Sequence, residues 1–263
     1  ATKGEIVSTV DKALGVLELF SETRTSVGLS VAARLLDRDK ATVQRYLAAL
    51  ESQGFLEQDP LTRGYHLGPA VTRLAMVREL TYPVEAAVKK ILTQLVKDTG
   101  ETAHLTHVQG TALSEVQIVE TTVKGTRVYI DPASLLPLHA TASGIALLSQ
   151  VEPKKINAML GRSFEQFTDE TPLTRESVLD AVACARRNGY ARALGTFETD
   201  VVGTAAPVFN MNNAVCGAIA VAAPTSRFNV SVGDHIAMHV VAAAASISRI
   251  YGAQDAQAQH AAE

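Results

Sequence analysis

Residues 40–68 read KATVQRYLAALESQGFLEQDPLTRGYHLG, and this stretch determines the fold of the N-terminal part of the chain. In its first half apolar residues recur at helical spacing up to Gly54, which predicts an amphipathic helix that ends there. The second half suggests two short strands, residues 55–58 and 64–67, joined by an Asp-Pro-Leu-Thr-Arg turn. The apolar face of the predicted helix consists of Val43, Tyr46, Leu47 and Leu50. A helix followed by a β-hairpin is therefore expected.

Two shorter helices are predicted before this stretch. The first can be capped by Ser8 or Thr9, and the second covers residues 30–35. The apolar positions of the first helix are Val10, Leu14, Leu17 and Phe20. Three short helices followed by a hairpin form the layout of a winged helix-turn-helix, whose third helix enters the major groove of DNA.

The polar face of the third helix carries residue types that suit DNA. Glutamine can pair with an adenine edge and arginine with guanine, while threonine and lysine contact phosphates. Two more arginines lie in the preceding helix and turn, and the hairpin offers an arginine and a tyrosine placed to reach the DNA backbone or the minor groove. The predicted DNA-binding residues are Arg34, Arg38, Lys40, Thr42, Gln44, Arg45, Arg63 and Tyr65.

The charge of this region leaves an alternative open. Residues 1–68 contain eight Lys and Arg against nine Asp and Glu, a net charge of −1. A domain that relies on neutralising phosphates is usually more basic. A winged helix that contacts another protein is therefore the second interpretation, and DNA binding would depend on a local basic stripe and on docking as a dimer.

Composition changes near residue 68, after which the chain is richer in Ala, Val and Thr. We predict a winged helix-turn-helix domain over residues 6–68, a linker helix over 69–82, a second domain over 83–252 and a loose tail over 253–263. The second domain mixes helices with an antiparallel sheet, so the fold class is α+β.

Within the second domain, a meander of three strands is expected between residues 101 and 131, with turns at Gly110 and Gly125. Helices are expected over residues 83–99, 141–149, 151–160, 176–188 and 232–251. Two further strands are expected over residues 205–209 and 215–222.

The overall composition is that of a globular protein. The chain has 263 residues, is 47% hydrophobic and 19% charged, and carries a formal net charge of −3. These values exclude a disordered chain and a highly basic nucleic-acid coat. Two cysteines make no disulfide framework, and neither a signal peptide nor an apolar run of membrane-spanning length is recognisable. We expect a cytoplasmic protein that does not associate with a membrane.

Catalytic and metal-binding patterns are weak. His104 and His107 have an odd spacing, which on a strand directs the two rings to opposite faces, so both are interpreted as structural. The sequence has no glycine-rich phosphate loop and no nucleophile elbow. We therefore predict no catalytic residue, no metal and no cofactor. The alternative is an enzyme built on the second domain, with His139 and Cys216 as its candidates and the winged helix as an interaction module.

The segment Pro137-Leu-His-Ala-Thr-Ala-Ser-Gly144 predicts a binding site, because it leads into a helix. Backbone amides at the start of a helix accept a carboxylate without any basic side chain. The predicted site residues here are Thr141, Ala142, Ser143 and Gly144. Simple capping of the helix by Thr141 is the other interpretation of the same residues.

Several motifs in order resemble the isocitrate-lyase-regulator (IclR) family of bacterial transcription factors. They are Leu29-Ser-Val-Ala-Ala-Arg-Leu, Lys40-Ala-Thr-Val-Gln-Arg-Tyr-Leu-Ala-Ala-Leu-Glu, Gly64-Tyr-His-Leu-Gly, Thr99-Gly-Glu-Thr-Ala-His-Leu, Pro137-Leu-His-Ala-Thr-Ala-Ser-Gly, Gly189-Tyr-Ala and Ala205-Ala-Pro-Val. The resemblance implies a winged helix, a linker helix and a GAF-like effector-binding domain, assembled as dimers or tetramers. It also implies allosteric control of operator binding by a small organic acid held at the segment 137–144.

The chain departs from the pattern of the family's small-acid sensors at several positions. In the pattern that the resemblance implies, an acidic residue stands where this chain has Ala193 or Leu194, and a lysine stands where it has Ile145. A cysteine stands where this chain has Gly203, and two serines stand where it has Ala220 and Ala222. Ala193, Gly203, Ala220 and Ala222 are therefore further candidate effector-binding residues. Because each change removes a polar group, we predict a wider and more apolar pocket that suits an aromatic or longer aliphatic acid.

Overall fold

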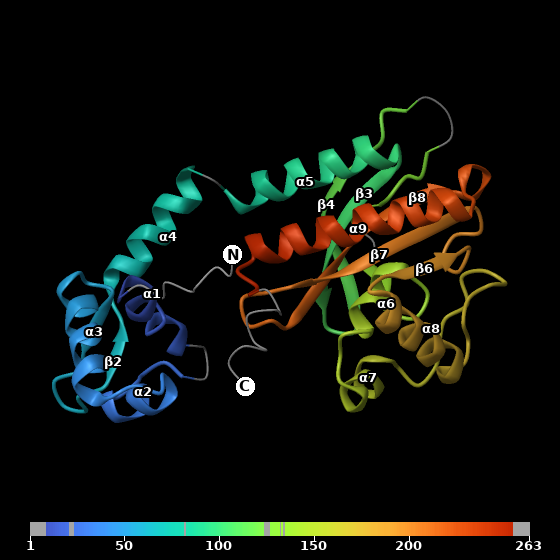
Figure 1. Ribbon diagram of the computed structural model, residues 1–263. Helices are drawn as coiled ribbons and strands as arrows, with labels where there is room; N and C mark the ends of the chain where they lie inside the picture. Colours follow the sequence, from blue (N-terminus) through green and yellow to red (C-terminus); the bar gives the residue numbers. More distant parts are fainter. Residues whose placement is uncertain are drawn as a thin grey trace, which may run out of the picture. The chain divides into compact units, whose positions relative to one another are not determined.

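The computed structural model describes residues 9–20, 24–81, 83–123, 127–131, 133 and 135–254 (Figure 1). The predicted helix cap Ser8, the predicted turn at Gly125 and most of the predicted tail lie outside these residues. The chain divides into two compact units, residues 1–83 and residues 84–263. Each unit has its own core and is described by itself.

The N-terminal unit is a winged helix-turn-helix. Its elements are α1 (Thr9–Leu14), a 3₁₀ turn (Leu17–Leu19), α2 (Leu29–Leu35), α3 (Lys40–Ser52), β1 (Leu56–Gln58), β2 (Tyr65–Leu67) and α4 (Pro69–Thr81). Strands β1 and β2 pair antiparallel with Leu56 opposite Leu67, and Val27 forms an isolated bridge to Tyr65. The predicted winged fold is confirmed.

The first helix is shorter than predicted. It ends at Leu14, and the chain turns at Gly15 before the 3₁₀ turn that follows. Val10 and Leu14 are 64% and 50% exposed, so they are not part of the core of this unit. A glycine directly after Leu14 explains the break, because glycine is the weakest helix former apart from proline.

Helix α3 begins at a side-chain cap. The carboxylate of Asp39 accepts a hydrogen bond from the backbone amide of Thr42 at 2.8 Å. This bond holds the pKa of Asp39 below its ordinary value. The predicted apolar face of α3 lies in the core of the unit, where Val43, Tyr46, Leu47 and Leu50 are buried. The opposite face of the helix is therefore exposed.

The C-terminal unit is built on one six-stranded antiparallel sheet with the strand order β5-β4-β3-β8-β7-β6. Its strands are β3 (Thr102–Gln109), β4 (Ala112–Val119), β5 (Leu135–Pro137), β6 (Ala191–Leu194), β7 (Val201–Phe209) and β8 (Val215–Pro224). Its helices are α5 (Val84–Thr99), α6 (Ala142–Leu148), α7 (Pro153–Met159), α8 (Arg175–Asn188) and α9 (Val230–Ile250), with a 3₁₀ turn at Thr225–Arg227.

Two strands differ from the prediction. Residues 127–131, expected to form the third strand of the meander, carry no strand; the partner of β4 is β5 instead, with Leu136 opposite Leu113. Strand β6 was not predicted, because its sequence Ala-Arg-Ala-Leu is short and lacks β-branched residues. The α+β class with an antiparallel sheet is confirmed.

The two faces of the sheet are covered by different helices (Figure 1). Helices α5 and α9 pack against each other and against β3, β7 and β8, whereas α6 contacts the opposite face of β7 and β8 and α8 lies beside it. Among the described residues α9 is the one helix long and apolar enough to span a membrane. Its buried residues lie in the core between α5, α9 and the sheet, as in a core helix of a folded domain.

A β-bulge interrupts the pairing of β3 with β4. His104 lies opposite Ile118, but Thr106 lies opposite Glu115, so Val116 is the extra residue on β4. Without the extra residue, alternation from Ile118 would direct Glu115 toward α5 and α9. The bulge instead places Glu115 on the same face as His104 and Thr106, beneath α6.

Candidate functional site

The exposed face of α3 brings together four of the residues predicted to contact DNA. Lys40, Gln44 and Arg45 are exposed and Thr42 is partly exposed. All four lie within the first two turns of the helix, with Gln44 and Arg45 on the side opposite the buried Val43 and Tyr46 and with Lys40 and Thr42 at the two edges of that side. This arrangement presents one amide, two cations and a hydroxyl on a single surface, which suits base edges and phosphates.

The predicted arginines lie on three neighbouring segments of the same unit. Arg34 is exposed on α2, and Arg38 is exposed in the turn before α3. Arg63 is exposed at the tip of the hairpin, where its backbone has a positive φ of 59°. The structure therefore leaves all three side chains accessible to a partner.

Tyr65 is not placed where the sequence suggested. Its side chain is only 1% exposed and belongs to the core of the unit, so the ring has no access to a phosphate or a groove. Its hydroxyl instead accepts a hydrogen bond from Nε2 of Gln44 at 3.4 Å. A residue expected to contact DNA thus supports the orientation of another.

The C-terminal unit contains a cavity of about 180 Å³ between the sheet and the start of α6. Strands β3, β4, β7 and β8 form its floor, and segments 128–131 and 196–198 contribute to its walls. The cavity is lined by His104, Glu115, Val128, Ile130, Asp131, Leu136, Ala140, Thr141, Ala142, Ser143, Ala193, Thr196, Phe197, Glu198, Val201, Gly203, Ala220 and Ala222.

Seven of the eight predicted effector-binding residues line this cavity; Gly144 does not. Its amide donates to the hydroxyl of Thr141 at 3.1 Å, and the same hydroxyl donates to the carbonyl of Pro137 at 2.8 Å. A Cβ at Gly144 would overlap the backbone of Leu138, so the absence of a side chain lets α6 pack closely there. Capping therefore accounts for the Gly144 amide, while Ala142 and Ser143 face the cavity.

Small side chains on β6, β7 and β8 leave room for the cavity. Ala193, Gly203, Ala220 and Ala222 line it together, and a Cβ at Gly203 would lie 3.1 Å from the Cβ of Ala142. The remaining two positions where the sequence departs from the family pattern lie elsewhere. Leu194 is 54% exposed, and Ile145 is buried in the core between α6 and the sheet.

Two polar side chains in the cavity were not predicted to belong to it. His104 is 8% exposed; its Nε2 lies 3.5 Å from Oγ of Ser143, and its Nδ1 has no hydrogen-bond partner among the described residues. Both carboxylate oxygens of Glu115 are inaccessible to solvent and likewise have no partner there. Burial raises the pKa of Glu115 to about 8 and lowers the pKa of His104 to about 4.

The remaining charged groups of the cavity are acidic. Asp131 and Glu198, interpreted from the sequence as turn residues, both line it, and burial raises the pKa of Glu198. Neither lysine nor arginine occurs among the described lining residues. Since His104 is neutral at pH 7, an anion bound here would be held by hydroxyl groups and backbone amides and not by a cation.

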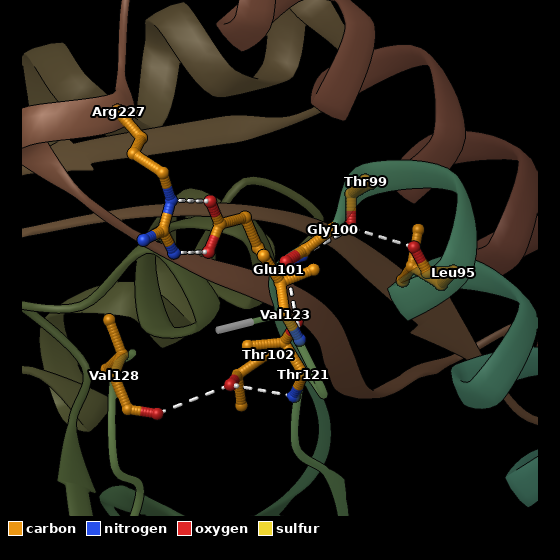
Figure 2. A network of polar contacts seen from close by, with 9 residues as sticks. All are labelled: Leu95, Thr99, Gly100, Glu101, Thr102, Thr121, Val123, Val128 and Arg227. Atoms are coloured by element: carbon orange, nitrogen blue, oxygen red, sulfur yellow. Dashed lines mark hydrogen bonds and ion pairs between the residues drawn. The ribbon is translucent and has the colours of Figure 1, made fainter. Parts of the chain in front are cut away.

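A network of polar contacts anchors one wall of the cavity (Figure 2). The hydroxyl of Thr102 donates to the carbonyl of Val128 at 3.3 Å and accepts from the amide of Thr121 at 3.4 Å. Beside it, Arg227 forms a two-bond ion pair with the buried Glu101, at 2.8 and 2.6 Å (Figure 2). Val128 lines the cavity, so the network ties this wall to the start of β3.

The two residues considered for an enzyme lie in separate clusters. The ring of His139 packs on Phe164 and Phe167, with centroids 5.0 and 5.9 Å apart. Cys216 packs against the cluster beneath α9, and burial raises the pKa of its thiol. As the sequence suggested, His104 and His107 lie on opposite faces of the sheet: His104 lines the cavity, while His107 makes an edge-on ring contact with Tyr251 on the other face.

Both units match models of known domain families. The IclR helix-turn-helix domain matches residues 9–60, and the C-terminal domain of the bacterial transcriptional regulator IclR matches residues 80–249. The HTH-type transcriptional regulator XynR of Escherichia coli is 28% identical over 248 residues, which are 94% of this chain and 98% of XynR.

Solved structures with the same fold cover almost the whole chain. A crystal structure of an IclR transcriptional regulator from Silicibacter sp. TM1040 is 38% identical, with a TM-score of 0.71, and the match covers 94% of this chain and 97% of that one. An IclR homologue from Microbacterium hydrocarbonoxydans, solved in complex with 4-hydroxybenzoate, has a TM-score of 0.56 at 20% identity, covering 92% of this chain and 100% of that one.

Proposed function

The chain belongs to the IclR family of bacterial transcriptional regulators, and we propose that α3 reads its operator while the cavity of the C-terminal unit binds the effector. In this proposal residues 6–68 bind DNA, residues 69–82 link the domains and residues 83–252 bind the effector. The observation that carries the DNA-binding part is the exposure of Lys40, Gln44 and Arg45 on one face of a side-chain-capped helix.

Each exposed residue has a proposed role. Gln44 pairs with an adenine edge and Arg45 with guanine, while Lys40 and Thr42 contact phosphates. Arg34, Arg38 and Arg63 add backbone contacts from the neighbouring segments. Tyr65 is a positioning residue, because its buried hydroxyl is bonded to Gln44.

Binding to the DNA that flanks the protein's own gene tests these roles. Arg45→Ala should lower operator affinity by about 1–3 kcal/mol and relax base preference at one position, since a bidentate arginine–guanine contact is lost. Arg162→Ala, which removes an exposed arginine from the other unit, is the matched control and should bind like the wild type. If Arg45→Ala binds the operator with unchanged affinity and sequence preference, the proposal that α3 reads the DNA bases is wrong.

For the effector we propose a small organic acid with an aromatic or aliphatic body. A cavity of about 180 Å³ has room for one ring, since roughly 150 Å³ is enough to hold benzene. The alanines and Gly203 provide apolar contact, and Ser143 offers a hydroxyl to the acid group. Calorimetric titration should give tighter binding for aromatic acids than for glyoxylate or pyruvate. 4-Hydroxybenzoate is a suitable first member of the series, because a protein of the same fold binds it. Micromolar binding of glyoxylate or pyruvate would contradict this class.

Dimer formation is also proposed. Apolar side chains are exposed on α1 and α4: Val10, Leu14, Leu74, Met76, Val77 and Leu80. Isolated apolar side chains are ordinary on a surface, but several on two helices are typical of an interface. The two α3 helices of the dimer would then read half-sites about 34 Å apart, or a multiple of this. The effector would change the spacing of these helices through the linker helices. We propose that the protein acts in the cytoplasm. Sedimentation of Leu80→Glu should show a monomer if this surface is the interface.

A further inference from the structure

The cavity contains polar groups that the small-acid model does not use. Both oxygens of Glu115 and Nδ1 of His104 are buried without a partner among the described residues. A buried polar atom without a hydrogen bond costs on the order of 1–3 kcal/mol, so such groups at a cavity wall indicate that something else completes them.

The placement of Glu115 depends on a specific local structure. The bulge at Val116 turns the carboxylate from the α5–α9 face of the sheet to the cavity face. There Glu115 lies on β4 opposite Thr106 of β3, and Thr106 is two residues along β3 from His104. Glu115 and His104, the two side chains with unpartnered polar atoms, therefore lie at the same end of the cavity floor. Leu136 from β5 adds an apolar wall beside them.

We propose that Glu115, assisted by His104, binds a hydrogen-bond donor on the effector, a hydroxyl or a protonated amine, so that the cavity selects such a ligand over an isosteric apolar one. This inference rests on the proposed function, because it places the effector in this cavity. It adds a second polar group to the ligand beside the acid group, since the hydroxyl of Ser143 lies 3.5 Å from Nε2 of His104.

The protonation of the two side chains agrees with this assignment. The pKa of Glu115 is raised to about 8, so near pH 7 the group is largely a neutral carboxylic acid that can accept from a hydroxyl and donate to the same oxygen. His104 is neutral and has one ring nitrogen free to accept or donate. Asp131 and Glu198 are the other titratable groups that line the cavity, and both would favour a donor over an acceptor.

Phenol and toluene make a direct test, because a hydroxyl replaces a methyl of similar size and neither carries an acid group. We expect the wild type to bind phenol about tenfold or more tightly than toluene in calorimetry or ligand-observed NMR. In Glu115→Leu this ratio should fall to about 1, and in Glu115→Gln, which keeps an acceptor, a preference for phenol should remain. Glu176→Leu, at an exposed position of α8 outside the cavity lining, is the matched control and should keep the wild-type ratio, whereas Glu198→Leu tests the other carboxylate.

Benzylamine separates the two kinds of donor. The affinity of its ammonium group should rise between pH 6 and pH 8 as Glu115 ionises, whereas the affinity of phenol, which carries no charge, should change much less. Circular dichroism of each variant checks that the fold is kept, and Glu115→Gln carries the test if Glu115→Leu does not fold.

The other results can be told apart by what they overturn. Equal binding of phenol and toluene to the wild type removes donor selection but leaves the cavity a ligand site. If the preference for phenol is lost in Glu198→Leu but kept in Glu115→Leu, the assignment to Glu115 is overturned and Glu198 has the role. Binding of none of the probes overturns both this inference and the effector site, whereas a ligand that saturates the cavity without changing operator binding overturns only the proposed regulation.

Discussion

The two faces of the six-stranded sheet solve the same packing problem differently. On β8 the residues facing α5 and α9 are Ile219, Val221 and Ala223, and they lie in a filled core with Leu105. The residues facing α6 are Ala218, Ala220 and Ala222, and on this face the cavity remains. The same strand therefore builds a solid core with one set of alternate residues and leaves the cavity beside the other. The cavity results from small side chains more than from specialised ones.

The largest effect should come from emptying the filled face. Ile219→Ala should lower the free energy of unfolding by about 2–5 kcal/mol, because the fully buried side chain leaves a hole in a tightly packed cluster. Urea unfolding measures this change. The variant for comparison with Ile219→Ala is Ala220→Gly on the other face, which removes one methyl group beside an existing cavity. If Ile219→Ala costs no more than Ala220→Gly, the contrast between the faces is wrong.

Filling each face with the same substitution sharpens the comparison. Ala222→Leu adds three carbons toward the cavity and should reduce the affinity for every cavity ligand at least tenfold while keeping the fold. Ala223→Leu, one residue on, adds the same atoms to the filled face and should cost about 1–3 kcal/mol of stability. Calorimetry of ligand binding and thermal unfolding of both variants would show the two effects separately. Equal destabilisation by both would mean that the cavity is not open space.

The smallest effect concerns the buried acid of the cavity face. The folded protein keeps a proton on Glu115 up to a pKa of about 8, whereas the unfolded chain releases it near the ordinary value of 4.5. Stability therefore falls as the pH rises from about 4.5 to about 8. Glu115→Gln has no proton to lose, so its advantage over the wild type should be absent near pH 4.5 and grow as the pH rises to about 8.

His104 acts in the opposite direction and must be kept in both proteins of that measurement. Its pKa falls from an ordinary 6.5 to about 4, so its contribution to stability is lost as the pH falls through this window. Comparing Glu115→Gln with the wild type at each pH cancels the histidine term. An advantage of the variant that does not depend on pH would contradict the burial of an ionisable group at this position.

The sequence predicted the N-terminal unit more completely than the cavity, and the reason is local. The winged helix follows from helical spacing and a turn that lie within residues 40–68, where each signal is contiguous. Tyr65 was misplaced because an aromatic on a short hairpin strand gives no indication of which face is buried. Its bridge to Val27 is a long-range contact that spacing does not reveal.

The small residues of β6, β7 and β8 were found through the resemblance, and Thr141 and Ser143 through the helix entry, but His104 and Glu115 were not predicted to line the cavity. Strict alternation on β4 would direct Glu115 to the wrong face, and only the bulge at Val116 corrects this. Val128 and Ile130 were expected in a strand, yet they line the cavity in a segment without strand structure that is held by the hydroxyl of Thr102. Such a tertiary contact between segments 26 residues apart leaves no periodic trace in the sequence.

The bond between Gln44 and Tyr65 has a consequence for changing what the protein reads. If α3 reads DNA as proposed, a library that randomises the exposed positions around Gln44 would retain the tether that restricts the rotamers of Gln44. New sequence preferences would then be sampled with one orientation of this side chain. A library that combines changes at position 44 with Tyr65→Phe would remove the hydrogen bond and leave the buried ring in place. A buried residue of the core would then become one of the positions that can be varied to change the operator sequence.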